Sequence, residues 1–332
     1  MDRSKSHPAS AVSPAIVPPL LEWFRGNARD LPWRADRDPY RVWLSEIMLQ
    51  QTRVGAVIGY FERFVAALPT VEALAAADED TLMALWAGLG YYRRMRLLHE
   101  CAKRIVGEFG GVFPSEPEEL QKLPGIGAYT AGAIASIAFD RAAPAVDGNV
   151  LRVLARLAAD NAWSADSAGK ALRGLYPAGR CGDFTQSLME LGATVCLPNG
   201  APRCGACPLA GFCRAHRSGR VAEFPALRAK AERPVEELAV YLLRFGGMIA
   251  LRRRPKSGLL AGWWELPNEP LAGAGAPERF GRVVARRSAR HIFTHREWRM
   301  TLFEIEADRA FPEYEWRSGT AVALPAAFRK LL

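Results

Sequence analysis

The sequence predicts a mainly α-helical domain followed by a small α+β domain. Up to about residue 214, apolar residues recur at spacings of three and four, the period of an amphipathic helix, and short Gly/Pro segments separate the repeats. After a charged segment with two prolines, short apolar runs joined by Gly-Gly are typical of a β-hairpin. We therefore predict a disordered tail at 1–15, a helical domain at 16–215, a linker at 216–236 and a second domain at 237–332.

The apolar period of the first domain is clearest in separate segments that we expect to be helices. Proline and glycine mark the short loops between them. The segments are residues 40–64, 71–87, 94–109, 130–138, 149–157 and 184–195.

The second domain begins with two apolar runs, residues 238–245 and 248–251, that flank Gly246-Gly247. We predict an antiparallel strand pair there. Residues 291–303 predict another strand pair, and residues 328–332 a terminal helix.

Length and charge narrow the class of protein. A chain of 332 residues has room for about two domains, and 49% hydrophobic residues are enough for substantial cores. Because no apolar run reaches membrane-spanning length, we expect no membrane contact. Separately, we expect the protein to be a monomer. The net charge of +9 favours a polyanionic partner, since lysines and arginines release counterions from phosphates. Many basic proteins bind no nucleic acid, so the charge matters only beside specific motifs.

Four clustered cysteines, Cys196, Cys204, Cys207 and Cys213, follow the pattern C-x7-C-x2-C-x5-C. Structural zinc usually takes two C-x2-C pairs, whereas a single tight pair with outlying cysteines suits a 4Fe–4S cluster. Zinc stays open on spacing alone. The clustering indicates a reducing compartment rather than a disulfide framework, and the tail lacks the apolar core of a signal peptide. In a bacterium we would expect the cytoplasm, with the nucleoid.

Two backbone motifs point to phosphate and to a fixed carboxylate. Gly125 and Gly127 lie in a Gly-x-Gly hairpin between helical segments, where positive φ exposes N–H groups that hold a phosphate without reading sequence. The alternative is an ordinary turn. Asp147 stands at the predicted N-cap of the helix at 149–157, and its alternative role is capping alone.

Hairpin, Asp147 and the cysteine loop follow one another in the order found in the helix-hairpin-helix DNA glycosylases. Finer motifs resemble the adenine DNA glycosylase (MutY) family: RDLPWR at 29–34, WLSEIMLQQT at 43–52, GLGYY at 88–92 and VDGN at 146–149. The resemblance covers roughly residues 16–300. It implies a helix-hairpin-helix glycosylase domain with a C-terminal 4Fe–4S loop, followed by a Nudix-like domain. The first cysteine gap of seven is one longer than the family's six.

Two carboxylates make chemical sense together. Glu46 has apolar helix neighbours, and desolvation would raise its pKa and favour a proton donor; the alternative is a surface glutamate. The helix dipole would keep Asp147 ionised, and such a pair suits cleavage of a glycosidic bond. The resemblance implies that Glu46 protonates adenine, that Asp147 stabilises the cationic sugar, and that Tyr129 and Asn149 support the transition state.

The resemblance also indicates which residues contact the adenine and which contact its partner base. It implies that the pocket for a flipped adenine is lined by Arg29, Leu31, Trp33 and Gln186. It implies that the residues entering the duplex beside 8-oxoguanine are Gln51, Thr52, Leu89 and Tyr91. The alternative for Leu89 and Tyr91 is a place in the core.

The end of the chain resembles the Nudix-like domain of the same family, through residues 257–267 and 293–295. No glutamate-rich Nudix box is present in the sequence, so we expect no pyrophosphatase activity. Thr294 and His295 match a loop that reads 8-oxoguanine, with threonine in place of serine. We expect the arginines at 252–254, 286–287 and 290 to bind the DNA backbone; the alternative is an ordinary solvated face.

The sequence therefore predicts an adenine DNA glycosylase that binds double-stranded DNA with adenine opposite 8-oxoguanine or guanine. We predict a monofunctional enzyme, because Tyr129 stands where relatives of the endonuclease III type carry a lysine that forms a Schiff base. One rival is a lyase of that type acting on oxidised pyrimidines. The other is a non-enzymatic iron–sulfur DNA-binding protein, which the pair Glu46 and Asp147 disfavours.

Overall fold

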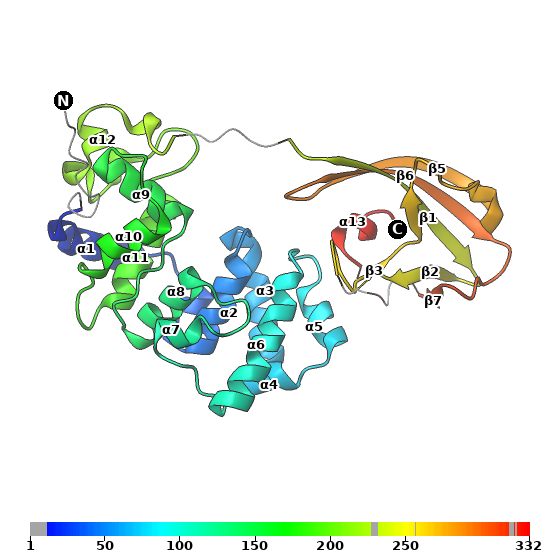
Figure 1. The fold of residues 1–332 in the computed structure, drawn as a ribbon, viewed down its shortest axis with the longest axis horizontal. Coiled ribbons are helices and arrows are strands. Elements are labelled where there is room, and N and C mark those ends of the chain that lie inside the picture. Colours follow the sequence, from blue (N-terminus) through cyan, green and yellow to red (C-terminus); the bar gives the residue numbers. More distant parts are fainter. Residues whose placement is uncertain (1–11, 227–231, 256, 319–321, 323) are drawn as a thin grey trace. The chain divides into compact units, whose positions relative to one another are not determined.

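The computed structural model describes residues 12–226, 232–255, 257–318, 322 and 324–332, and it divides into two compact units. The first comprises Met1–Ala77 and Arg96–Arg228, and the second comprises Asp78–Met95 and Ala229–Leu332. A helical unit and a unit with a mixed sheet confirm the predicted fold class (Figure 1). The boundaries differ in one respect. Residues Asp78–Met95, expected within the helical domain, cluster with the C-terminal unit.

The helical unit is built from short helices joined by tight loops. One helix, α6 (Arg93–Phe109), continues from one unit into the other. The remaining helices of this unit are α1 (Val17–Asn27), α2 (Pro39–Leu49), α3 (Val54–Ala67), α4 (Val71–Ala76), α7 (Pro117–Leu120), α8 (Ala128–Phe139), α9 (Gly148–Ala158), α10 (Ala165–Arg173), α11 (Cys181–Thr194) and α12 (Arg214–Arg217).

Two predicted helical segments are each divided in the structure. The segment at 40–64 becomes α2 and α3, separated at Gln51, whose φ of 57° lies in the left-handed region. The segment at 71–87 becomes α4 and α5 (Glu79–Trp86), because Asp78 adopts an extended conformation and caps α5 by accepting from the Thr81 amide. Apolar periodicity alone runs through both breaks without detecting them.

The core of the helical unit positions three helices that carry candidate site residues. α8 packs against α2 and α11, and α11 packs against α9 (Figure 1). Leu154, Phe184 and Leu188 are fully or almost fully buried where α9 meets α11. Gly192 of α11 is required there, since a Cβ atom would lie 2.8 Å from the Cβ of Asn149. The close approach brings the start of α9 beside α11.

Two expectations about irregular segments need correction. The predicted disordered tail lies outside the described residues up to residue 11, but Val12 is buried in the core and Pro14–Ile16 forms a 3-10 turn. Residues 214–236 are only partly the predicted linker. α12 and a 3-10 turn at Val221–Glu223 precede the undescribed residues 227–231, and Phe224 packs into an apolar cluster.

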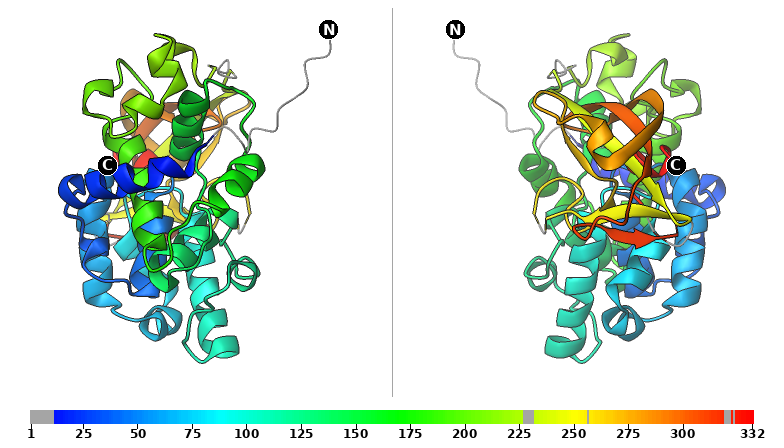
Figure 2. Two further views of the ribbon diagram at one scale, coloured as in Figure 1. Left: turned by 90° about the vertical axis from the view of Figure 1, so that its left-hand side faces the viewer. Right: turned by 90° about the vertical axis from the view of Figure 1, so that its right-hand side faces the viewer.

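The second unit contains a sheet of seven strands. Its strands are β1 (Val235–Phe245), β2 (Met248–Arg253), β3 (Trp264–Glu265), β4 (Asn268–Pro270), β5 (Gly281–Ile292), β6 (Glu297–Ala307) and β7 (Glu315–Arg317). The main order is β3-β2-β1-β6-β5; β4 also pairs with β1, and β7 with β2. β1 and β6 run parallel, and the other pairs are antiparallel. Figure 2 shows these strands from two opposite sides.

The predicted hairpin at Gly246-Gly247 is confirmed by antiparallel pairing of β1 with β2. The second predicted strand pair is confirmed in kind but not in extent, since β5 already begins at Gly281. The first half of β5 was not predicted, because its arginines weaken the alternation of apolar and polar residues that indicates a strand. The terminal helix is α13 (Ala326–Arg329), slightly earlier than predicted. None of the described helices is both long and apolar enough to cross a membrane.

Candidate functional site

A cavity of about 620 Å³ opens in the helical unit between the loop before α2 and the helices α2, α8, α9 and α11. Ten of the predicted site residues line it, although they come from six separate stretches of sequence. They are Arg29, Leu31, Trp33, Glu46, Gln51, Thr52, Tyr129, Asp147, Asn149 and Gln186.

Glu46 lies at the wall of this cavity on α2 and is only 7% exposed. Burial raises the pKa of its carboxyl group to about 7, and the negative charge of Asp147 acts in the same direction. A hydrogen bond with the Tyr129 hydroxyl and the charge of Arg34 oppose the shift without cancelling it. The predicted desolvated setting is confirmed, and the surface alternative is wrong. A carboxyl group with this pKa is partly protonated at neutral pH.

Asp147 is held at the N-terminus of α9 by two hydrogen bonds. One carboxylate oxygen accepts from the Val150 amide at 2.8 Å, which confirms the predicted N-cap. The other accepts from the Asn149 side-chain amide at 2.7 Å. Both bonds fix the orientation of the carboxyl group, which lines the cavity.

Two further charged residues of the cavity, Arg34 and Glu190, were not predicted from the sequence. Glu190 is fully buried and receives hydrogen bonds from Arg29 at 2.6 Å and from Arg34 at 2.8 Å. Burial alone would raise the pKa of Glu190, but these two arginines outweigh it and lower the pKa. The sequence does hold a signal, since Glu190 lies one helical turn after Gln186 on α11 and faces the same side.

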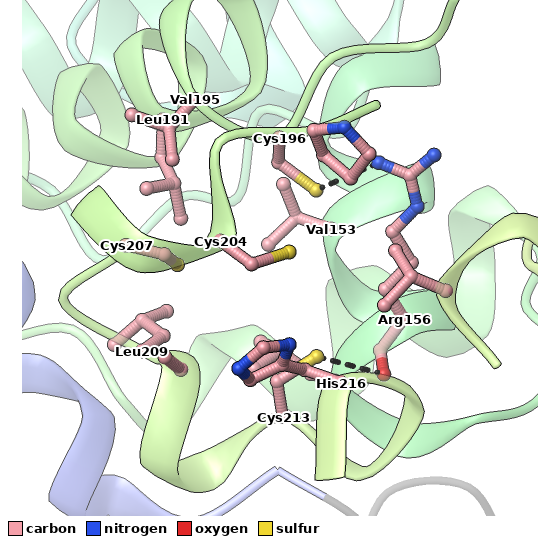
Figure 3. A pocket seen from close by; sticks show the side chains of 14 residues that line it. Val153, Arg156, Leu191, Val195, Cys196, Cys204, Cys207, Leu209, Cys213 and His216 are labelled. Carbon is pink, nitrogen blue, oxygen red and sulfur yellow. Dashed lines mark hydrogen bonds between the residues drawn. The ribbon is translucent and has the colours of Figure 1, made fainter. Parts of the chain in front are cut away.

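The four clustered cysteines line a second cavity, beside the C-terminal ends of α9 and α11 (Figure 3). Apolar side chains, including Val153, Leu191 and Leu209, form its walls. In the part of the chain that the structure describes, no three His, Cys, Asp or Glu side chains form a site for a single metal ion.

The chemistry of this cysteine cavity fits an iron–sulfur cluster. Burial raises the pKa of Cys207 to about 11 and also raises the pKa values of Cys204 and Cys213. Thiolates in such an apolar place therefore require a cation, and a bound metal deprotonates the thiols that coordinate it. A cluster of four irons would take one of the four cysteines at each iron.

Two buried arginines connect α9 with the cysteine loop. Arg156 donates to the sulfur of Cys196 at 3.3 Å and to the carbonyl of Leu197 at 2.9 Å. Arg152 donates to the carbonyl of Cys196 at 2.8 Å and to the side-chain oxygen of Asn149, also at 2.8 Å. One guanidinium group thus touches both the cysteine loop and the residue that holds Asp147.

The Gly-x-Gly hairpin lies between α7 and α8, and Tyr129 of the first cavity follows Gly127 by two residues. Gly125 has the expected positive φ, 75°, and a Cβ atom there would lie 2.8 Å from the Cβ of Leu97. Gly127 differs from the prediction, because its φ is −89° and it is the extended N-cap of α8. Its exposed backbone still leads into a helix N-terminus, where N–H groups face outward.

The remaining predicted residues, Leu89, Tyr91, Thr294 and His295, all belong to the second unit. Tyr91, Thr294 and His295 are exposed, whereas Leu89 is buried, as the core alternative requires. The Tyr91 hydroxyl lies 2.7 Å from the Thr294 hydroxyl oxygen. The structure therefore joins the loop after α5 to the turn between β5 and β6.

The fold agrees with comparisons to known proteins. The family model described as "HhH-GPD superfamily base excision DNA repair protein" matches residues 44–177, and the "NUDIX domain" model matches residues 239–332. A thermostable thymine-DNA glycosylase structure is similar, with a TM-score of 0.57 and 28% identity over 61% of this chain and 96% of that chain. These matches define the class: a helix-hairpin-helix protein of base excision repair with a second, NUDIX-type domain.

Sequence relatives narrow the class further. An adenine DNA glycosylase of Arabidopsis thaliana is 40% identical over 336 residues, covering 88% of this chain and 52% of the relative. Another, from Buchnera aphidicola subsp. Baizongia pistaciae, is 34% identical over 245 residues, covering 72% of this chain and 70% of the relative. The chain belongs to the adenine DNA glycosylase family. It spans about half the length of the Arabidopsis relative.

Proposed function

We propose that this protein is a monofunctional adenine DNA glycosylase that hydrolyses the N-glycosidic bond of adenine paired with 8-oxoguanine or guanine. The observation that carries the proposal is the pair of carboxyl groups at one cavity. Glu46 has a raised pKa, and both carboxyl oxygens of Asp147 are held by hydrogen bonds. A buried proton donor beside a second, fixed carboxyl group suits an oxocarbenium-like transition state.

In this mechanism Glu46 is the general acid. Its proton passes to the adenine ring as the bond between the base and C1′ of the sugar breaks, so the base leaves without building up negative charge. The resulting carboxylate then accepts a proton from the water that adds to C1′. The Tyr129 hydroxyl, which is hydrogen-bonded to the Glu46 carboxyl, orients it for both transfers.

Asp147 has the complementary role. Its carboxylate stabilises the positive charge that develops on the sugar. The Asn149 amide and the Val150 N–H hold both carboxylate oxygens, so little reorganisation is needed when the charge appears. Negative charge also keeps the neighbouring Glu46 protonated until the base receives the proton.

The rest of the cavity suits a flipped purine. Leu31 and Trp33 supply buried apolar surface for the base plane. Gln186 and the pair of Arg29 with Glu190 supply donors and acceptors for its edge. Gln51 and Thr52, on the same cavity wall, would take the space that the base leaves in the duplex.

We propose that the second unit reads the partner base through Tyr91, Thr294 and His295, all of them exposed. The hairpin at Gly125 and Gly127 would bind a backbone phosphate. Cys196, Cys204, Cys207 and Cys213 would hold a 4Fe–4S cluster, whose contribution is to fix the loop rather than to take part in hydrolysis.

The proposal is tested with a panel of duplexes in a single-turnover assay. The panel contains adenine opposite 8-oxoguanine, guanine or thymine, together with thymine opposite guanine and an oxidised pyrimidine. We expect alkali-labile sites only at adenine opposite 8-oxoguanine or guanine, with 8-oxoguanine preferred. Excision of thymine or of the oxidised pyrimidine in place of adenine would contradict the proposal.

If the enzyme is monofunctional, borohydride should trap no covalent complex between the wild-type protein and DNA. A trapped complex requires an amine that forms an imine with C1′, and Tyr129 provides none. The side chain of Lys122, near the hairpin, is exposed and ion-paired with Glu119 at 2.6 Å, so we expect no trapping through it.

The control for accidental trapping is Lys122→Ala. Strand cleavage should need added alkali in both proteins. Strong trapping that persists in Lys122→Ala would reveal a different lysine that attacks the sugar. That result would move the protein to the lyase class.

A further inference from the structure

The segment that carries Tyr91 is attached, by its own contacts, to the NUDIX-type domain. It comprises α5, the loop at 87–92 and the first turn of α6, and it clusters with the C-terminal residues as one compact unit. In sequence it lies more than a hundred residues before that domain, inside the predicted helical domain. Its attachment therefore depends on side-chain contacts rather than on neighbouring sequence.

The first contact is made by Arg253 at the end of β2. Its guanidinium lies 3.1 Å from a carboxylate oxygen of Asp80 and 3.7 Å from the sulfur of Met83, both on α5. The same group donates to the Gly262 carbonyl at 3.0 Å and stacks over the Trp264 ring at 4.0 Å. Because these last two contacts fix the guanidinium within the domain, it presents a fixed partner to α5.

The second contact is aromatic and buried. The rings of Tyr92 and Trp263 lie with their centroids 3.8 Å apart and their planes tilted by 36°, and Trp263 has no exposed surface. Beyond the area that it buries, an aromatic pair contributes a free energy of the same order as an exposed ion pair. The segment is therefore held by both contacts, the aromatic pair of Tyr92 with Trp263 and the contact of Arg253 with α5.

The third contact is made by Tyr91, in the loop between α5 and α6. Tyr91 has a φ of 49°, an unfavourable value for a tyrosine, and its backbone carbonyl accepts from the Arg94 amide at 2.9 Å. In this conformation its hydroxyl reaches the Thr294 hydroxyl. Both side chains are exposed, so they form one polar surface built from two distant segments.

Arg253 contacts α5, whereas its two neighbours in the arginine run bind within the NUDIX-type domain. Arg252 and Arg254 both bind Glu265, which is 2% exposed. The single carboxylate of Glu265 balances one of these two positive charges within the domain. Arg253 is directed to α5 instead.

We propose that Arg253 and Trp263 are positioning residues that dock residues 78–95 on the NUDIX-type domain, so that Tyr91 and Thr294 act as a single lesion-reading element. The reading role rests on the proposed function. The docking does not, because its contacts exist without DNA. Partner-base discrimination would then depend on Arg253 and Trp263, which do not themselves read the partner base.

The test compares Asp80→Arg, Arg253→Asp and the charge-swapped double variant in the full chain. Hydrogen exchange of residues 78–95, measured without DNA, reports docking. The ratio of adenine excision rates opposite 8-oxoguanine and opposite guanine reports discrimination. We expect each single variant to exchange faster and to lose roughly fivefold or more of this ratio, the lower range of coupling between sites. The swap should restore both readouts toward wild type.

The matched control is Arg317→Asp, because Arg317 stacks on the same Trp264 ring at 4.5 Å but pairs with Glu315. It should change neither readout. Unchanged exchange in both single variants would overturn the docking. A ratio that falls with Arg253→Asp and stays low in the swap would instead show that Arg253 contacts DNA directly. Absence of adenine excision by wild type would refute the proposed function while the exchange data still decide the docking.

Discussion

Glu46→Gln should abolish adenine excision while leaving duplex binding nearly unchanged. The glutamine keeps the size of the side chain and its hydrogen bond with Tyr129, but it carries no proton to transfer. Loss of a general acid typically costs about 10² to 10⁴ in rate. Single-turnover excision and an equilibrium binding assay on the same duplex measure the two effects separately.

The same variant should be more stable than wild type at neutral and higher pH. The folded pKa of Glu46 is raised from its ordinary value of 4.5 to about 7, so the folded state binds this proton more tightly than the unfolded state. The stabilisation is complete below the unfolded pKa and is lost as the pH rises through the folded pKa. Relative to Glu46→Gln, the free energy of unfolding of wild type should fall by about 3 kcal/mol across this window.

The control is Glu62→Gln, at an exposed position on α3. It should keep wild-type excision and show no pH-dependent difference in stability, as measured by denaturant unfolding from about pH 5 to about pH 8. Excision by Glu46→Gln within about threefold of wild type would remove Glu46 from the mechanism, since a general acid contributes far more than that.

Cys204→Ser should lose the cluster and DNA affinity together. Wild-type protein should be brown, with visible absorbance and about four irons per chain. The variant should lack both, because three cysteines are too few for a cluster that takes one at each of four irons, and the thiols of Cys207 and Cys213, whose pKa values burial raises, would have no metal to hold them as thiolates. Loss of order in the cysteine loop should reach Asn149 through Arg152, and excision should fall as well.

The matched control is Cys181→Ala, a buried cysteine at the start of α11 that does not line the cysteine cavity. It should keep its iron and its visible absorbance. Stoichiometric zinc in wild type prepared without oxygen and with ample iron would show instead that the cavity is a zinc site.

Much of the fold was predictable because helix and strand periods are local properties of the sequence. The predicted fold class is confirmed, and so are the hairpin at Gly246-Gly247 and the N-cap at Asp147. The burial of Glu46 was also predictable, since its helix neighbours are apolar. The breaks at Gln51 and Asp78 were not, because backbone conformation interrupts the helices there without interrupting the apolar pattern.

Long-range contacts explain the rest. Glu190 is buried at the cavity that Glu46 and Asp147 line, because Arg29 and Arg34, far away in sequence, pair with its charge. The attachment of residues 78–95 to the NUDIX-type domain depends on a few contacts, such as Tyr92 with Trp263, that no local pattern encodes. For the same reason, deleting the C-terminal domain does not isolate its own role in lesion reading. The deletion would also remove the contacts that Tyr91 and Tyr92 make with Thr294 and Trp263.

The central claim is that Glu46 and Asp147 cleave the glycosidic bond of adenine and leave the DNA backbone intact. The most direct measurement is mass spectrometry of both products from a duplex with adenine opposite 8-oxoguanine. We predict free adenine together with a full-length strand that carries an unmodified abasic site. Intact adenine in the duplex, or a strand already cleaved at the abasic site without added alkali, would contradict the account.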